Sequence, residues 1–131
     1  MFTILIKRGD VVRVLFPNSN LVSAKRRPAL VVQADNLNAG LPQILLAMIT
    51  SNMNRADHPS RITIALNSTE GKVSGLRTDS VIMTDNIVTV LETEIDSVLG
   101  KLPSMKAVDN ALRHSFGLNE NTEDFENGKS N

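Results

Sequence analysis

The sequence predicts a mainly β domain, either a compact barrel or a strongly bent sheet, that ends in a single helix. Three observations support this class. Short segments with strand-like patterns follow one another between residues 11 and 91, with turn-forming residues between them. Only one later segment has the apolar spacing of an amphipathic helix. The length of 131 residues suits one domain with a core of ordinary size.

The first strand is expected over residues 11–16, whose side chains alternate with a period of two. Gly9-Asp10 in front of it is a turn signal, and Pro17 ends it because proline has no N–H to donate to a neighbouring strand. Two continuous apolar runs of strand length follow, at Ala29–Ala34 and Gln43–Ile49. A polar segment with Asn, Gly and Pro separates these runs and is predicted to be a loop.

Three further strands are predicted in the second half of the domain. Arg61–Leu66 alternates again and places its apolar side chains on one face. Ser80–Met83 and Ile87–Leu91 are two short candidates that follow the turn-like segment Thr69–Gly75. Five to seven short strands at this spacing are typical of a small barrel or a bent sheet.

The one predicted helix starts after Pro103-Ser104, with Ser104 as its N-cap, and stops at Gly117. Its apolar residues fall on a single stripe, so the helix is expected to lie across the sheet. The stripe consists of Met105, Val108, Ala111, Leu112 and Phe116.

The composition changes after Leu118. Residues 1–118 carry 13 basic and 10 acidic side chains, whereas residues 119–131 carry one and four. Such a polar segment buries too little apolar surface to offset the entropy of ordering it. The sequence therefore predicts one folded domain at 1–118 and a disordered acidic tail at 119–131.

Composition excludes several kinds of site. There is no cysteine, so disulfides, thiolate metal sites and a cysteine nucleophile are ruled out. Only 3% of the residues are aromatic, all of them Phe, which excludes stacking of bases on Tyr or Trp. The formal net charge of zero argues against a uniformly basic surface, although the first 35 residues carry six basic and two acidic side chains.

No membrane or export segment is expected, and the default location is the cytoplasm. The longest wholly apolar run, Ile44–Ile49, is much shorter than the ~20 residues needed to span a bilayer. Met1–Ile6 is mostly apolar but precedes Lys7 and Arg8, which reverses the order of charged and apolar regions in a signal peptide.

Metal and cofactor sites are not expected. The two histidines, His58 and His114, lie far apart and outside any metal-ligand motif. His58 is expected in a polar loop, and His114 on the polar side of the helix near its end. Glycine-rich phosphate loops are absent.

Two polar segments next to apolar runs are candidate binding sites. Lys25-Arg26-Arg27-Pro28 immediately precedes the run at 29–34, and Pro28 biases Arg27 toward an extended backbone. Three consecutive cations there suggest an anion site, although a solvated loop is the alternative. Thr50-Ser51-Asn52 directly follows the run at 43–49, where binding residues are common, with ordinary turn chemistry as the alternative.

Together these residues resemble the MazF/PemK family of toxins from bacterial toxin–antitoxin pairs. The resemblance runs from about residue 7 to residue 118 and consists of short pieces in a fixed order. The pieces are Lys7–Val12, Arg27–Val32, Ile49–Ser51, Ser74–Leu76, Asp79–Val81, Asp85 and Val98–Leu102.

The resemblance implies a small SH3-like barrel of the MazF/PemK/CcdB plasmid-toxin type that acts as a homodimer. It further implies metal-independent cleavage of single-stranded RNA, by attack of a ribose 2′-OH on the adjacent phosphate, and silencing by an antitoxin with an acidic, disordered segment. The family's central catalytic pair corresponds here to Arg27 and Thr50. Asp85 aligns with an acidic position that has a base role in some members. The expected RNA contacts are Asn20, Lys25, Arg26, Ser51, Asn52 and Arg77.

One departure from the family leaves two alternatives open. Some relatives have a cleavage arginine where this chain has Met83, and a methionine cannot donate a hydrogen bond to phosphate. Its role is either lost or taken by Arg77. A lost role would favour a non-enzymatic gyrase poison of the same fold or an inactive module that only binds an antitoxin.

Overall fold

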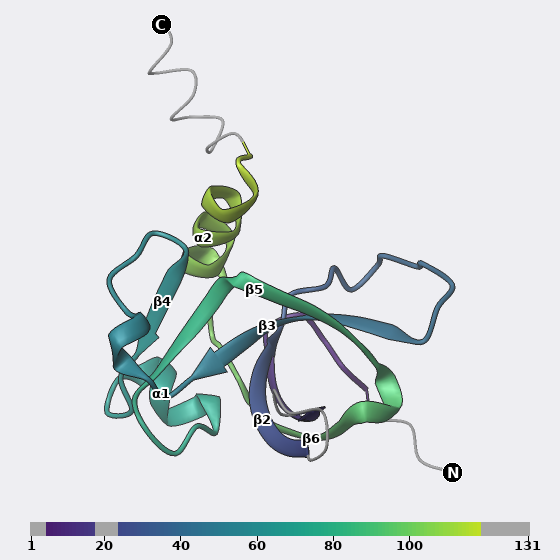
Figure 1. Ribbon diagram of the computed structural model, residues 1–131, viewed down its shortest axis with the longest axis horizontal. Coiled ribbons are helices and arrows are strands. Elements are labelled where there is room, and N and C mark those ends of the chain that lie inside the picture. Colours follow the sequence, from purple (N-terminus) through teal and green to yellow (C-terminus); the bar gives the residue numbers. More distant parts are fainter. Residues whose placement is uncertain (1–4, 18–23, 119–131) are drawn as a thin grey trace, which may run out of the picture.

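The computed structural model describes residues 5–17 and 24–118, so the expected tail at 119–131 lies outside the described residues. Within this part, six strands form one antiparallel sheet in the order β4-β5-β3-β2-β1-β6. Figure 1 shows the sheet curled round on itself, with helix α2 at one end. The elements are β1 (Asp10–Pro17), β2 (Ala24–Val31), β3 (Gln43–Thr50), η1 (Met53–Arg55), β4 (Arg61–Ile64), α1 (Thr69–Ser74), β5 (Ser80–Leu91), η2 (Glu92–Glu94), β6 (Ile95–Lys101) and α2 (Lys106–Phe116).

The bend of the sheet coincides with breaks in strand register. Between Ala47 and Met48 of β3, the partner on β5 jumps from Ile87 to Met83, so residues 84–86 form a bulge. Such a bulge bends the strand and increases its twist. The edge strands β4 and β6 do not pair with each other, so the sheet does not close. The mainly β class with a C-terminal helix is confirmed, and the predicted barrel is corrected to a strongly bent, open sheet.

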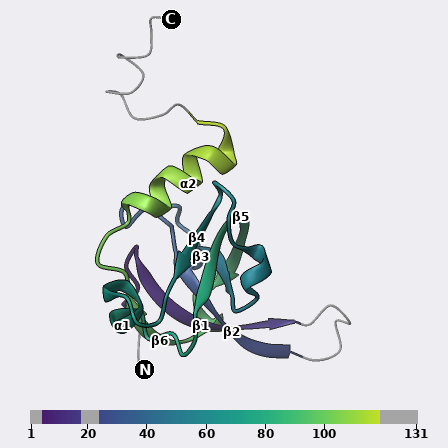
Figure 2. The same cartoon turned by 90° about the vertical axis from the view of Figure 1, so that its left-hand side faces the viewer.

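β2 begins five residues before the predicted apolar run and ends at Val31. The basic residues at its start belong to the strand because their backbone pairs with β1, with Leu15 opposite Arg26 and Val14 opposite Arg27. Backbone pairing tolerates polar side chains where those side chains are exposed, as all three basic residues are. The basic segment is therefore a strand that projects from the sheet, as Figure 2 shows, and not a loop, although its basic side chains are exposed to solvent.

Three other elements differ from the predictions. The two candidates at 80–83 and 87–91 are parts of one long strand, β5, because residues 84–86 form a bulge within it. β6 was not predicted as a strand, since its apolar residues do not alternate regularly. The turn-like segment at 69–75 contains α1, whose N-cap Ser68 accepts a hydrogen bond from the Gly71 N–H at 3.0 Å.

Apolar side chains cover both faces of the sheet. Val11 and Val12 are neighbours on β1 that point to opposite faces, and both are fully buried. The first core cluster contains Val12, Val14, Ala29, Val31, Ile44, Leu46, Met48, Val90 and Ile95. The second core cluster contains Val11, Leu30, Ala47, Ile49, Ile64, Ile82, Leu102 and Val108, the last from α2.

Helix α2 packs against β4 and β5, across one end of the sheet (Figure 2). It starts one residue later than predicted, with Met105 as N-cap, and the Ser104 hydroxyl accepts a hydrogen bond from the Lys106 N–H at 3.2 Å. Gly117 ends it in the left-handed conformation, as predicted. Phe116 is 58% exposed, so the predicted apolar stripe is buried only in part. Among the described residues, no helix is long and apolar enough to cross a membrane.

Gly75 directly follows α1, at a point where the chain passes very close to β6. It caps the C-terminus of α1 with φ +79°, a conformation that L side chains rarely adopt. A Cβ at Gly75 would overlap the carbonyl oxygen of Leu99 on β6. The position therefore requires glycine both for backbone conformation and for space.

We expect Gly75→Ala to lower the free energy of unfolding by about 3 kcal/mol or more, because overlap adds to the strain of a left-handed backbone. Gly40 has almost the same φ, +77°, but open space around it. Gly40→Ala is therefore the matched control and should cost only about 1 kcal/mol. Urea unfolding measures both, and equal losses would contradict the proposed close approach.

An ion pair reinforces the pairing of edge strand β4 with β5. Arg61 Nη2 lies 2.7 Å from Asp85 Oδ2, and Arg61 Nη1 also donates to the carbonyl oxygen of Arg55 at 3.1 Å. The hydrogen bond from Arg61 lowers the pKa of Asp85 below its ordinary value. The carboxylate is thus charged and engaged at neutral pH.

We expect Asp85→Asn to destabilise the protein at pH 7, by less than about 1 kcal/mol because the pair is partly exposed. A carboxyl group with a lowered folded-state pKa contributes stability above its unfolded-state pKa, and the contribution is lost as the pH falls through the folded-state pKa. The difference between wild type and variant should therefore shrink below about pH 4. Urea unfolding from pH 7 to pH 3 tests this, and Arg61→Gln should give the same trend.

Candidate active site

The candidate site lies where β2 separates from β3. β2 pairs with β3 only at Ala29, Leu30 and Val31, opposite Met48, Ala47 and Leu46. The next residue, Pro28, has no N–H to donate to a neighbouring strand. Continued in the same register, Arg27 would face Thr50, but the strands diverge there. The divergence leaves an open groove of about 410 Å³.

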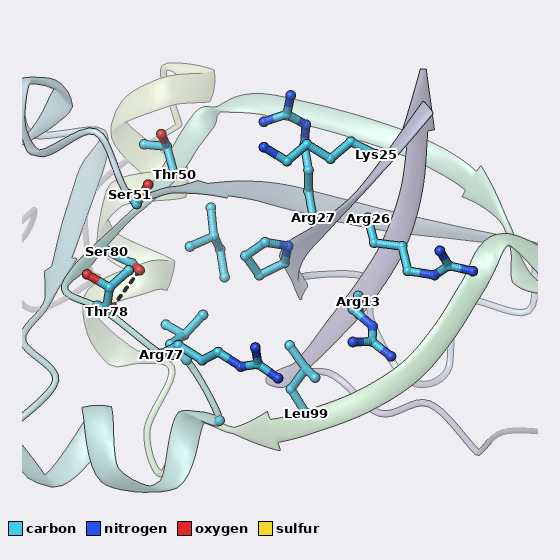
Figure 3. Close-up of a pocket in the computed structure, with 14 residues that line it drawn as sticks. Arg13, Lys25, Arg26, Arg27, Thr50, Ser51, Arg77, Thr78, Ser80 and Leu99 are labelled. Carbon is cyan, nitrogen blue, oxygen red and sulfur yellow. Dashed lines mark hydrogen bonds between the residues drawn. The ribbon is translucent and has the colours of Figure 1, made fainter. Parts of the chain in front are cut away.

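Five basic side chains line this groove, and none of the lining residues is acidic. Figure 3 shows Arg27 and Lys25 on the side of the groove near Thr50, and Arg13 and Arg26 at the opposite end. Arg77 reaches in from the segment after α1. A cationic groove without carboxylates attracts anions, and guanidinium groups match the geometry of phosphate oxygens.

Hydroxyl groups line the end of the groove that lies opposite Arg13 and Arg26. Thr50 and Ser51 come from the end of β3, and Thr78 and Ser80 from the start of β5 (Figure 3). The Thr50 hydroxyl oxygen accepts a hydrogen bond from the Asn52 N–H at 3.1 Å, which fixes its orientation. The hydroxyl hydrogen can then be donated to an oxygen of a bound ligand.

Six predicted site residues line the groove: Arg27, Thr50, Lys25, Arg26, Ser51 and Arg77. Asn52 is not a lining residue; its side chain caps η1 by accepting from the Asn54 N–H at 3.1 Å. Asn20 lies outside the described residues. The sequence thus predicts six of the nine polar side chains of the groove, although they come from segments distant in the chain.

Asp85 does not line the groove. It lies at the bulge of β5 and is held by Arg61 on the side of β4. Its lowered pKa makes it a weak proton acceptor. Met83, where some relatives have an arginine, packs against the first core cluster instead of facing the groove.

Several other lining residues are not among the predicted site residues, including Arg13, Thr78, Ser80 and Leu99. Arg13 could have been noticed as the one charged residue within the alternating strand at 11–16. Asp96 on β6 holds it, with its Oδ2 atom 2.7 Å from Arg13 Nη2, and the same oxygen lies 3.5 Å from Arg26 Nε. The hydrogen bond from Arg13 lowers the pKa of Asp96.

The two histidines, which are far apart in the sequence, lie together away from the groove. The rings of His58 and His114 are 5.9 Å apart in an edge-to-face arrangement. His58 Nδ1 accepts from the Ser60 N–H at 3.1 Å. Among residues 5–17 and 24–118, no three His, Cys, Asp or Glu side chains are placed to share a metal ion.

Comparisons with known proteins agree with this fold. Curated relatives include Endoribonuclease MazF2 of Mycobacterium bovis and Endoribonuclease MazF6 of Mycobacterium tuberculosis. Each is 36% identical over 107 residues, covering 79% of this chain and 90% of the relative.

Solved structures with the same fold include a mycobacterial endoribonuclease in complex with its cognate antitoxin. Its TM-score is 0.68 at 23% identity, over 89% of this chain and all of that one. A MazE–MazF complex from Deinococcus radiodurans has a TM-score of 0.66 at 19% identity, over 88% of this chain and all of that one.

A family model adds the decisive match. The model of the PemK-like, MazF-like toxins of type II toxin–antitoxin systems matches residues 7–116, which is most of the chain and includes every element from β1 to α2. The chain therefore belongs to the family of PemK-like, MazF-like toxins of type II toxin–antitoxin systems.

Proposed function

We propose that this toxin is an endoribonuclease that cleaves single-stranded RNA in the groove between β2 and β3. The observation that carries the proposal is the placement of Arg27 and Thr50 on the two diverging strands of a groove lined by five cations. RNA offers a phosphate at every nucleotide, and such a groove follows the backbone of a single strand. Similarity to relatives named endoribonucleases supports the same activity and does not favour a gyrase poison.

The proposed reaction is a transfer within the RNA strand. The ribose 2′-OH attacks the adjacent phosphorus, the 2′-O–P bond forms and the P–O5′ bond breaks. The products are a 2′,3′-cyclic phosphate and a 5′-OH; the 2′-OH proton passes to water and the leaving 5′ oxygen takes up a proton. No metal ion takes part in this scheme.

Arg27 and Thr50 act on the charge that develops in this step. Negative charge gathers on the non-bridging phosphate oxygens in the transition state, and a guanidinium offers paired N–H donors to them. Thr50, oriented by Asn52, donates its hydroxyl hydrogen to a phosphate or ribose oxygen. Because Arg61 engages Asp85 outside the groove, the proposal assigns Asp85 no proton transfer in this chain.

The same groove is the proposed site of inhibition. An acidic segment of a cognate antitoxin would bind the cations at 25–27 and exclude RNA from them. A solved structure with this fold is an endoribonuclease in complex with its cognate antitoxin, which supports a protein partner of this kind. We further propose a homodimer in the cytoplasm, on the basis of family membership.

Removal of Arg27 tests the catalytic proposal. In excess EDTA, purified protein should cleave single-stranded RNA, and Arg27→Ala should lower the rate by about 10²–10³-fold because the transition-state charge loses its main donor. Thr50→Val keeps the shape but removes one charge-assisted hydrogen bond, and should cost about 10- to 100-fold. Gel analysis of a labelled transcript measures both.

The controls separate catalysis from general charge and folding. Lys106→Ala removes a cation that lies on α2, outside the groove, and should leave the rate unchanged. Asp85→Asn should also cleave at a rate within a few-fold of wild type, whereas removal of a general base would lower the rate by about 10²–10⁴-fold. Absence of cleavage by wild type, or equal cleavage by Arg27→Ala, would refute the proposal.

Competition tests the proposed inhibition. The cognate antitoxin should displace labelled RNA from the toxin, and Arg26→Glu should weaken binding of both because it reverses one charge at the shared site. Fluorescence anisotropy measures RNA displacement, with Lys106→Glu as the matched charge control. A ternary complex of toxin, antitoxin and RNA would show that the antitoxin and the RNA occupy different sites, and would contradict the proposed inhibition.

A further inference from the structure

We propose that Arg13 and Arg26, with Asp96 as their shared counterion, form a second phosphate-binding subsite in the groove, for an RNA phosphate other than the one that is cleaved. This inference rests on the proposed function, because it assigns a second contact to the same RNA strand. Arg26 on β2 is already an expected RNA contact, whereas Arg13 on β1 and Asp96 on β6 belong to no motif that the sequence singled out.

The three side chains come together from three neighbouring strands. Asp96 Oδ2 lies 2.7 Å from Arg13 Nη2 and 2.9 Å from Arg13 Nε, and 3.5 Å from Arg26 Nε. Both arginines line the groove, whereas Asp96 does not. The arginine side chains are 41% and 57% exposed, so a ligand in the groove can reach them.

This cluster is separate from the proposed cleavage centre. Figure 3 shows Thr50 and Ser51 at one end of the groove, and Arg13 and Arg26 at the other, beside Leu99. An RNA strand that places one phosphate between Arg27 and Thr50 carries its next phosphates along the groove. The Arg13–Arg26 end is where a neighbouring phosphate meets a pair of guanidinium groups.

Asp96 sets the charge of this subsite. Two guanidinium groups side by side repel each other, and one carboxylate reduces their net charge from +2 to +1. All three contacts use a single carboxylate oxygen. Since each guanidinium carries five N–H donors, the pair can bind a phosphate while Asp96 stays in place.

This arrangement predicts opposite effects for the two partners of one ion pair. Arg13→Gln removes a positive charge from the subsite and should weaken RNA binding. Asp96→Asn removes the neighbouring negative charge and should strengthen it. If the pair only supported the fold, both substitutions would weaken binding in the same direction.

The experiment measures binding of a short fluorescein-labelled 2′-O-methyl RNA of mixed sequence to the full chain across a range of salt concentrations. This RNA lacks the attacking hydroxyl, so binding is measured apart from cleavage. Each phosphate contact contributes about −0.7 to the salt slope of a single strand. Arg13→Gln should therefore flatten the slope by about 0.7, and Asp96→Asn should lower the dissociation constant several-fold. Lys106→Gln removes one positive charge, as Arg13→Gln does, but outside the groove, and should alter neither the salt slope nor the dissociation constant.

A second measurement identifies the phosphate. Replacing single phosphates of the probe, one at a time, by uncharged methylphosphonates should reveal one non-scissile position that weakens binding to wild type but not to Arg13→Gln. Equal sensitivity of both proteins at every position, or weaker binding by Asp96→Asn, would overturn the subsite. Cleavage activity is a separate outcome: a chain that shows this binding pattern without cleaving RNA refutes the proposed function alone.

Discussion

The structure depends on one break in strand pairing. β2 is paired with β1 along most of its length, but its pairing with β3 stops at Ala29, where Pro28 follows without an N–H to offer. Beyond this point β2 continues on β1 alone, and β3 ends at Thr50. The space that two paired strands would have filled becomes the groove. The candidate site thus forms in a sheet without any additional domain or long loop.

The break also explains which features could be predicted from the sequence. Arg27 and Thr50 were found because both motifs stand beside apolar runs and because they resemble known toxins. Their opposition across the groove was not predictable, because it depends on the register of β2 on β3. The sequence predicts two short strands in place of β5 for a similar reason: a bulge residue looks like a loop residue in the sequence.

Side-chain partners were the least predictable part. Asp85 occupies a position that resembles a catalytic acid or base, but the curvature of β5 directs it to Arg61 on β4. In the sequence, Arg13 is one residue of an alternating strand, and only the adjacency of β1, β2 and β6 brings it together with Arg26 and Asp96. The net charge of zero likewise conceals a groove lined by five cations and no carboxylate.

The burial of both faces of the sheet has a consequence for how such toxins diversify. Val11 and Val12 leave no solvent-facing side near the start of β1, so these two positions are constrained by packing on either face. The groove, in contrast, also contains exposed side chains that belong to neither core cluster, such as Lys25 and Arg26. Substitutions can therefore accumulate at these exposed positions of the groove, and on the proposed function alter which RNA is recognised, while the buried scaffold stays the same.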